Sequence, residues 1–425
     1  MVSNRKIFFL FLLLLSQQIF AGTGIYSDTI QLDLKGVEKR FLEQNLELLI
    51  AKTNIDQTKA LLLQSKLYDN PEVALNRELY NAGAKQFLST NKNTEYDLQF
   101  MQLLSTGGKY FKAIQIAKQK VKMSEYDFYD LLRSLKLELR ENFYELSQDQ
   151  QKMRVLTYGI NELNKLIDAT RTQVDKGYVA RKELIRLESL LLTYKTDQTE
   201  IADKTYEDVS DFKQLLNYTG NEYIVAIPDS DLSFTAKIEN VIYDSLEATA
   251  LTNRYDLQSA NLMMDIGKNE VQLEKMRAVP DLRMGVDYDT YGSAFPKYVG
   301  LVVGLPIPLW NWNQGNIKAA KAEYAQIQLE RKQKFNQVHN NLMEEYGQLL
   351  NKNKLYQSIN KEYYNSFEGI YQNIYESYKN RTIGIIEFLE YFDSYKETKF
   401  NLIDIQAELQ KQAQHVNFET GKDIF

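Results

Sequence analysis

The chain has 425 residues, 44% of them hydrophobic, which is enough for a packed core or for more than one domain. Its net charge of −6, with Lys and Arg spread among Glu and Asp, argues against a nucleic-acid partner, since phosphate binding needs a concentrated positive surface. The sequence contains no cysteine, which excludes disulfide bonds, thiol catalysis, cysteine-ligated zinc and a lipid anchor attached to cysteine.

The N-terminus has the pattern of a secretory signal peptide. Arg5 and Lys6 precede the apolar run 7–15, and Ala21 supplies a small residue for cleavage, so we expect residues 1–21 to be removed. The apolar run is too short for an uncleaved membrane anchor. Beyond it no run of about 18 apolar residues remains, so any membrane crossing would have to be made by β-strands.

The next elements are a helix, two strands and a long helix. An amphipathic helix is expected over 35–68. It ends before Pro71, because proline cannot continue a helix. Two strands follow, separated by a polar loop over 81–95. Their alternating apolar residues are Val73, Leu75 and Leu79 in the first strand and Tyr96, Leu98 and Phe100 in the second. The turn Thr106-Gly107-Gly108 then leads into a helix expected to continue to Lys176.

The same order of elements occurs a second time, which indicates an internal duplication. Residues 22–218 form the first predicted repeat and residues 237–425 the second, joined by a linker over 219–236 that contains Gly220 and Pro228. In each repeat a leucine precedes the helix-ending proline by the same distance. These pairs are Leu48 with Pro71, and Leu257 with Pro280.

The strands of the second repeat show one apolar and one polar face. Leu282, Met284, Val286 and Tyr288 alternate with Arg283, Gly285, Asp287 and Asp289, and a second strand runs from Val299 to Leu305. Strands of about ten residues can cross an outer membrane at a tilt, and Trp310 and Trp312 just beyond the second strand suit a membrane interface. The polar residues Asp97, Gln99, Asp287 and Asp289 are then expected to line a lumen.

Gly315 is expected to make the bend from strand to helix in the second repeat, as Gly108 does in the first. Apolar residues at steps of three and four then predict helices of about 100 Å, over 108–177 and 315–380. Turns at 176–178 and 379–381 would fold each into a hairpin. Four strands in one chain cannot close a membrane barrel, which needs about eight, so other copies of the chain are expected to complete it.

With this duplicated layout the chain resembles the outer-membrane efflux channels of the TolC type. Two segments carry the resemblance: VGLVVGLPIPLWNWNQGNIKAAKAE at the second strand and helix entry, and YKNRTIGIIEFLEYFDSY at the second hairpin turn. The resemblance implies a homotrimer in the outer membrane, with a shared twelve-stranded barrel continued by a helical tunnel across the periplasm. It also implies a passive exit duct for an inner-membrane pump joined by a periplasmic adaptor.

The resemblance further implies a constriction at the periplasmic end of the second hairpin, formed by Tyr378, Arg381, Glu387 and Glu390. Ile383 stands where some members have a basic residue, so the pattern of bonds in a closed state differs from theirs. Glu387 and Glu390 share one helical face, and threefold symmetry would stack them as acidic rings that favour cations. An ordinary solvated pair of glutamates is the alternative interpretation.

The sequence offers no catalytic, cofactor or metal site. His339 and His415 lie on separate helical segments without other ligands at metal-binding spacing, and no carboxylate pair is placed in a predicted cleft. The resemblance, together with this lack of catalytic sites, leads us to expect a channel for small solutes such as drugs or metal cations. The alternatives are an outer-membrane duct for protein secretion, which has the same architecture, and a periplasmic coiled-coil adaptor or scaffold without a pore.

Overall fold

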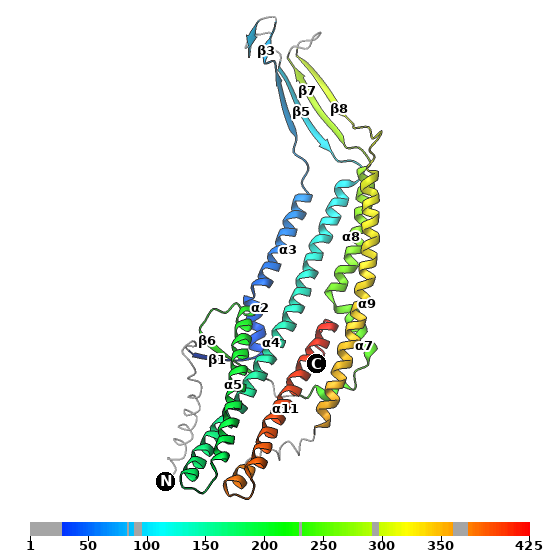
Figure 1. Ribbon diagram of the computed structural model, residues 1–425. Helices are drawn as coiled ribbons and strands as arrows, with labels where there is room; N and C mark the ends of the chain where they lie inside the picture. Colours follow the sequence, from blue (N-terminus) through cyan, green and yellow to red (C-terminus); the bar gives the residue numbers. More distant parts are fainter. Residues whose placement is uncertain (1–27, 83–84, 89–95, 229–231, 291–296, 360–372) are drawn as a thin grey trace, which may run out of the picture.

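The computed structural model describes residues 28–82, 85–88, 96–228, 232–290, 297–359 and 373–425. The predicted signal peptide over 1–21 lies outside these residues. The molecule is elongated, with a β-sheet at one end, long helices through the middle and helical hairpins at the other end (Figure 1).

The four predicted strands are confirmed, and they form one antiparallel sheet. They are β2 (Glu72–Arg77), β5 (Tyr96–Leu104), β7 (Leu282–Asp289) and β8 (Tyr298–Gly304). Their order is β2-β5-β7-β8, so the two strands of the first half of the chain lie beside the two strands of the second half. Within the described part of the chain, β2 and β8 are the open edges of this sheet.

The register of the sheet separates a polar face from an apolar one. Asp97 lies opposite Asp289, and Gln99 lies opposite Asp287, so these side chains project to the same side. Their neighbours Leu98 and Phe100 project to the other side, opposite Tyr288 and Val286. The alternation in the sequence thus predicted both faces correctly.

Two short sheets were not predicted from the sequence. Within the expected polar loop, β3 (Tyr80–Asn81) pairs with β4 (Gln86–Phe87). In the middle of the molecule, β1 (Asp28–Asp33) pairs in parallel with β6 (Glu222–Ile227). β6 lies inside the predicted linker 219–236, and its pairing with β1 connects that part of the chain to the segment that precedes α2.

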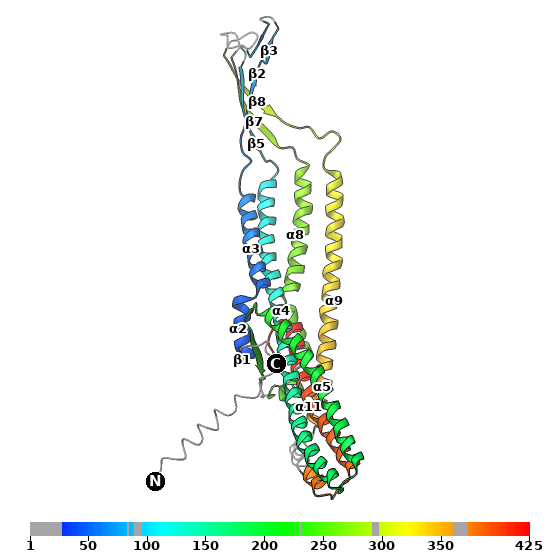
Figure 2. The same ribbon diagram turned by 60° about the vertical axis from the view of Figure 1, so that its left-hand side comes forward.

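Four helices lie side by side below the sheet (Figure 2). They are α3 (Leu46–Ser65), α4 (Lys109–Asp175), α8 (Tyr255–Arg277) and α9 (Gln314–Ser358), and neighbours in this order contact one another. The helix predicted over 35–68 is in fact two, because α2 (Leu34–Gln44) ends at Asn45. The Asn45 side chain accepts a hydrogen bond from the Leu48 amide and donates one to the Leu215 carbonyl oxygen, which fixes the break.

A similar break occurs at Arg254, between α7 (Tyr243–Asn253) and α8. The Arg254 guanidinium donates to both carboxylate oxygens of Asp256, at 3.0 and 2.7 Å, and also to the carboxylate of Glu419. The short helix α6 (Thr235–Ile238) precedes α7. These buried charges tie the start of α8 to the end of α11 (Ile385–Thr420).

The bend from sheet to helix differs between the two halves. In the first half Gly107 and Gly108 have φ of 66° and 79°, as expected for a glycine turn. In the second half Asn313, not Gly315, adopts the left-handed conformation, with φ of 66°. Gly315 lies inside α9, so its predicted role is wrong. Asparagine tolerates this conformation, and the Asn313 amide donates to the Glu274 carbonyl oxygen at 2.8 Å.

Both helical hairpins are present. α4 turns at Gly177 into α5 (Arg181–Leu215), and the helical segment 373–379 turns at Arg381 into α11. The expected continuity of α9 with that segment passes through 360–372, outside the described residues. Buried leucines and aromatics form three clusters along the helices, one around α2 and β6, one at the hairpin tips and one around α7, α9 and α11.

Candidate functional site

The two hairpin tips meet at the end of the molecule farthest from the sheet (Figure 1). Apolar side chains from both hairpins form one core there. Its members include Leu166, Leu187, Tyr378, Ile385, Phe388 and Phe392. This core fixes the second hairpin against the first, so groups at the two turns come within hydrogen-bonding distance.

Tyr378 joins the two hairpins. Its hydroxyl donates a hydrogen bond to Glu183 Oε2 at 3.3 Å, and its ring stacks on Phe388 with centroids 4.7 Å apart. Burial, followed by the negative charge of Glu183, raises the pKa of Tyr378 to about 12. The hydroxyl therefore stays protonated and remains a donor at neutral pH.

Arg381 makes a second bridge between the hairpins. Its backbone adopts φ of 61°, and its amide donates to the Tyr378 carbonyl oxygen at 3.0 Å, which closes the turn. This conformation lets the guanidinium reach back to Gln173 Oε1 on α4, at 2.8 Å. Both bridges lie beside a cavity of about 310 Å³ between the turns, lined by polar groups that include Thr170 and Gln173.

The structure divides the four predicted constriction residues into two pairs. Tyr378 and Arg381 connect the hairpins, whereas Glu387 and Glu390 lie exposed on α11, away from buried Phe388. The partners Glu183 and Gln173 were not predicted to take part. The position of Glu183 in the first hairpin, equivalent to that of Glu387 in the second, is the signal in the sequence that could have indicated it.

The predicted lumen residues lie together on the polar face of the sheet. Asn76 and Gln99 each donate a side-chain hydrogen bond to Asp97 Oδ2, both at 3.0 Å. Asp287 lies opposite Gln99 on β5, two residues from Asp97 on the same face of the sheet. Amide and carboxyl groups thus cluster near the end of the sheet that is distant from the helices.

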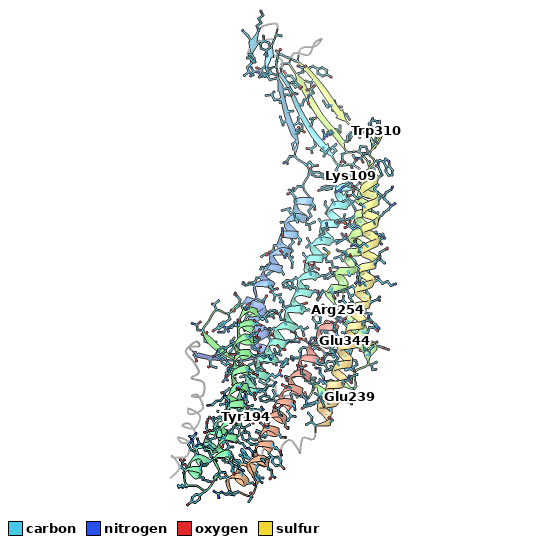
Figure 3. The ribbon with its side chains drawn as sticks, in the orientation of Figure 1. Lys109, Tyr194, Glu239, Arg254, Trp310 and Glu344 are labelled. Carbon is cyan, nitrogen blue, oxygen red and sulfur yellow. The ribbon has the colours of Figure 1, made fainter. Side chains whose placement is uncertain are left out.

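The predicted interface aromatics lie between β8 and α9, where the sheet meets the helices (Figure 3). Trp310 is 86% exposed and Trp312 52% exposed. The apolar faces of the edge strands are also exposed, as at Leu75 and Leu301. The described residues of one copy of the chain leave these large apolar side chains uncovered.

The two histidines lie apart, each beside a carboxylate. His339 Nδ1 is 2.6 Å from Glu247, and His415 Nε2 is 2.7 Å from Glu141. Among the residues that the structure describes, no three His, Cys, Asp or Glu side chains gather as they would around a metal ion. None of the helices in that part of the chain combines the length and apolarity needed to span a membrane.

Comparison with solved structures identifies the fold. CusC matches with a TM-score of 0.74 and 14% identity, over 95% of this chain and 96% of that one. The outer-membrane channel CmeC of Campylobacter jejuni matches with a TM-score of 0.72 and 15% identity, over 92% and 87%. The open state of the MtrE outer-membrane channel of Neisseria gonorrhoeae matches with a TM-score of 0.72 and 13% identity, over 92% and 89%.

Sequence comparison gives a weaker likeness. No family model matches the chain. A curated relative, the cobalt-zinc-cadmium resistance protein CzcC of Cupriavidus metallidurans, is 20% identical over 282 residues. This match covers 65% of the chain and 63% of CzcC, so the chain spans less than two thirds of that relative's length.

These similarities confirm the predicted resemblance: the chain has the fold of an outer-membrane channel of the TolC type. The solved relatives are channel proteins, and CzcC is a resistance protein.

Proposed function

We propose that the protein is a passive exit channel of the outer membrane, formed by three copies of the chain. The observation that carries this proposal is the sheet with two open edges. An open edge in lipid leaves backbone N–H and C=O groups without hydrogen-bond partners, which costs several kcal/mol for each group. Pairing β8 of one copy with β2 of the next satisfies both edges, and three copies then give a closed twelve-stranded barrel.

The side chains support this arrangement. The face that includes Leu75, Leu301 and Val299 is apolar and exposed, as a lipid-facing surface would be. The opposite face carries Asp97, Asp287 and Asp289, which would line a polar lumen. Trp310 and Trp312 would then lie in the inner headgroup layer of the outer membrane.

The helices support a periplasmic tunnel. α3 and α9 are the outer members of the layer α3-α4-α8-α9, and exposed apolar residues such as Ile50, Leu63 and Leu329 lie on them. In a trimer these edges would meet neighbouring copies. At the hairpin tips, Glu387 and Glu390 from three copies would form acidic rings that favour cationic solutes, while Tyr378 and Arg381 hold the tips closed.

We further propose that the channel receives small solutes, drugs or metal cations, from an inner-membrane pump through a periplasmic adaptor. The name of CzcC refers to resistance to cobalt, zinc and cadmium, which agrees with cationic cargo. No step of this function requires catalysis, because the channel only provides a path and the partner proteins provide the driving force.

The test uses the absence of cysteine in the natural sequence. Leu75→Cys on β2 is combined in turn with Val299→Cys, Leu301→Cys or Val303→Cys on β8, and membranes are oxidised before non-reducing electrophoresis. We expect one pair to give a covalent trimer in the outer-membrane fraction. Leu98→Cys on the central strand β5, with the same partners, is the control. A monomer in the soluble periplasmic fraction would exclude the channel.

A further inference from the structure

Two carboxyl groups, one buried and one half-buried, face each other between α4 and α5, away from the hairpin tips and from the four-stranded sheet. Asp149 on α4 is 2% exposed. Asp208 on α5 is half-buried and lies one turn after Lys204, which contacts Asp149, so its carboxyl group is on the side of α5 that faces Asp149. Lys204 Nζ lies 2.9 Å from Asp149 Oδ2 and is the cation that approaches this pair.

One ammonium group cannot neutralise the surrounding carboxylates. Glu145, one turn before Asp149 on α4, adds a further negative charge. On α11, Lys411 is already paired with Glu145 at 3.0 Å and with Glu408 at 2.6 Å. Asp208 Oδ2 is inaccessible to solvent and has no hydrogen-bond partner among the described residues. A buried carboxylate without a partner is costly, so a proton between the two groups is favoured.

We propose that Asp149 and Asp208 share one proton and that this proton locks α5 against α4 beside the β1–β6 sheet. The connection to the sheet is Gln150, the residue after Asp149. Its side chain donates to the Ile224 carbonyl oxygen at 2.8 Å and accepts from the Ala226 amide at 3.1 Å. When the proton leaves, repulsion between two carboxylates separates the helices and loosens β6.

The direction of the pH effect follows from the environment. Burial, followed by the negative charge of Asp149, raises the pKa of Asp208 from 3.8 to about 7. The folded chain therefore holds a proton that the unfolded chain releases between these values. The stability of the folded chain then falls as pH rises through this range. Above it the shared proton is lost and no longer holds α5 against α4. This inference does not depend on the channel function.

The experiment measures thermal unfolding of the full chain in detergent between pH 5 and pH 8. The wild type should lose about 3 °C in Tm over this range beyond the loss shown by Asp208→Asn, which keeps the shape and removes the titration. Asp149→Asn should flatten the profile in the same way. Asp211→Asn, an exposed site on the same helix, is the control and should retain the wild-type slope.

Two further measurements distinguish a shared proton from a simple packing role. Lys204→Met removes the neighbouring cation and should move the midpoint to higher pH, a change that loss of packing does not produce. Hydrogen exchange at the Ile224 and Ala226 amides should accelerate above neutral pH, after correction for the intrinsic rate, in the wild type but not in Asp208→Asn. An Asp208→Asn profile parallel to the wild type, or an unmoved midpoint in Lys204→Met, would overturn the proposal.

Discussion

Tyr378, beside the second hairpin turn, donates a hydrogen bond to Glu183 on α5, with the two oxygens 3.3 Å apart. This bond connects the two hairpins at their tips, and the stacking of Tyr378 on Phe388 holds the donor in place. Since the pKa of Tyr378 is raised to about 12, the hydroxyl keeps its proton and can donate throughout the physiological pH range.

The first prediction removes that bond. Tyr378→Phe keeps the stacked ring but loses the donor, so the proposed closed state should lose about 1 kcal/mol. This corresponds to roughly a fivefold increase in open probability in planar bilayers. Tyr391→Phe, an exposed site on α11, is the matched control. Equal open probability in the two variants would show that this bond does not restrain the tips.

The second prediction concerns the exposed acidic pair on α11. Glu387→Gln with Glu390→Gln should reduce the preference for cations over anions in single-channel recordings, because uncharged rings attract cations less. The same double change should leave the assembly intact, since both side chains are exposed. Glu330→Gln on α9 is the control. Unchanged selectivity in the double variant would mean that the pair is an ordinary solvated one.

The third prediction concerns the break between α7 and α8. Arg254→Met leaves the buried carboxylates of Asp256 and Glu419 without their main partner, which should cost about 3–5 kcal/mol. We expect a lower Tm in detergent. Arg277 is exposed and pairs with the partly buried Glu274, which keeps a hydrogen bond from Asn313, so the control Arg277→Met should change the Tm little. A similar Tm for both variants would contradict the stabilising role of Arg254 at the break between α7 and α8.

The fourth prediction concerns pH. The hydrogen bond from His415 to Glu141 raises the pKa of this histidine above 6.5, despite its partial burial. Its contribution to stability is therefore complete at pH values below 6.5 and is lost as pH rises through the folded pKa. Because the chain has two histidines, His339→Gln leaves one imidazole to titrate by NMR. Glu141→Gln should lower the measured pKa; an unchanged value would refute the role of Glu141.

The fifth prediction places the membrane boundary. Trp310 and Trp312 are the two tryptophans of the chain, so fluorescence reports on this segment alone. In liposomes, lipids brominated near the headgroup should quench more strongly than lipids brominated near the end of the acyl chain. Each of the variants Trp310→Phe and Trp312→Phe leaves one tryptophan, so measuring them separately gives the depth of each residue in the membrane. Quenching of neither residue would place the segment outside the membrane.

Local patterns in the sequence determined much of the fold. Alternation at Leu98 and Phe100, and again at Val286 and Tyr288, predicted the strands and both faces of the sheet, because a strand places successive side chains on opposite sides. Steps of three and four residues predicted the long helices, including the buried positions Leu139 and Leu342. The duplicated order predicted the two hairpins.

Only the tertiary structure decided which distant groups meet. β1 and β6 pair across most of the first half of the chain, and neither strand carries a local signal strong enough to reveal its partner. The helix breaks at Asn45 and Arg254 depend on hydrogen bonds to Leu215 and Glu419. Helix propensity cannot predict these breaks, because it reflects only local sequence. The sequence likewise predicts Gly315 at the bend because glycine is the usual residue with positive φ, whereas the structure gives this conformation to Asn313.

The hairpin tips show the same division. Tyr378 and Glu387 could be placed near a turn from the sequence, because the turn and the following helix have local signals. That Tyr378 bonds to Glu183 while Glu387 remains exposed depends on how α11 packs against α4 and α5. Hydrogen bonds between residues far apart in the chain arise from that packing. Local sequence patterns therefore determined the long helices and the four strands of the main sheet, whereas the packed core decided the remaining short elements and the contacts between distant residues.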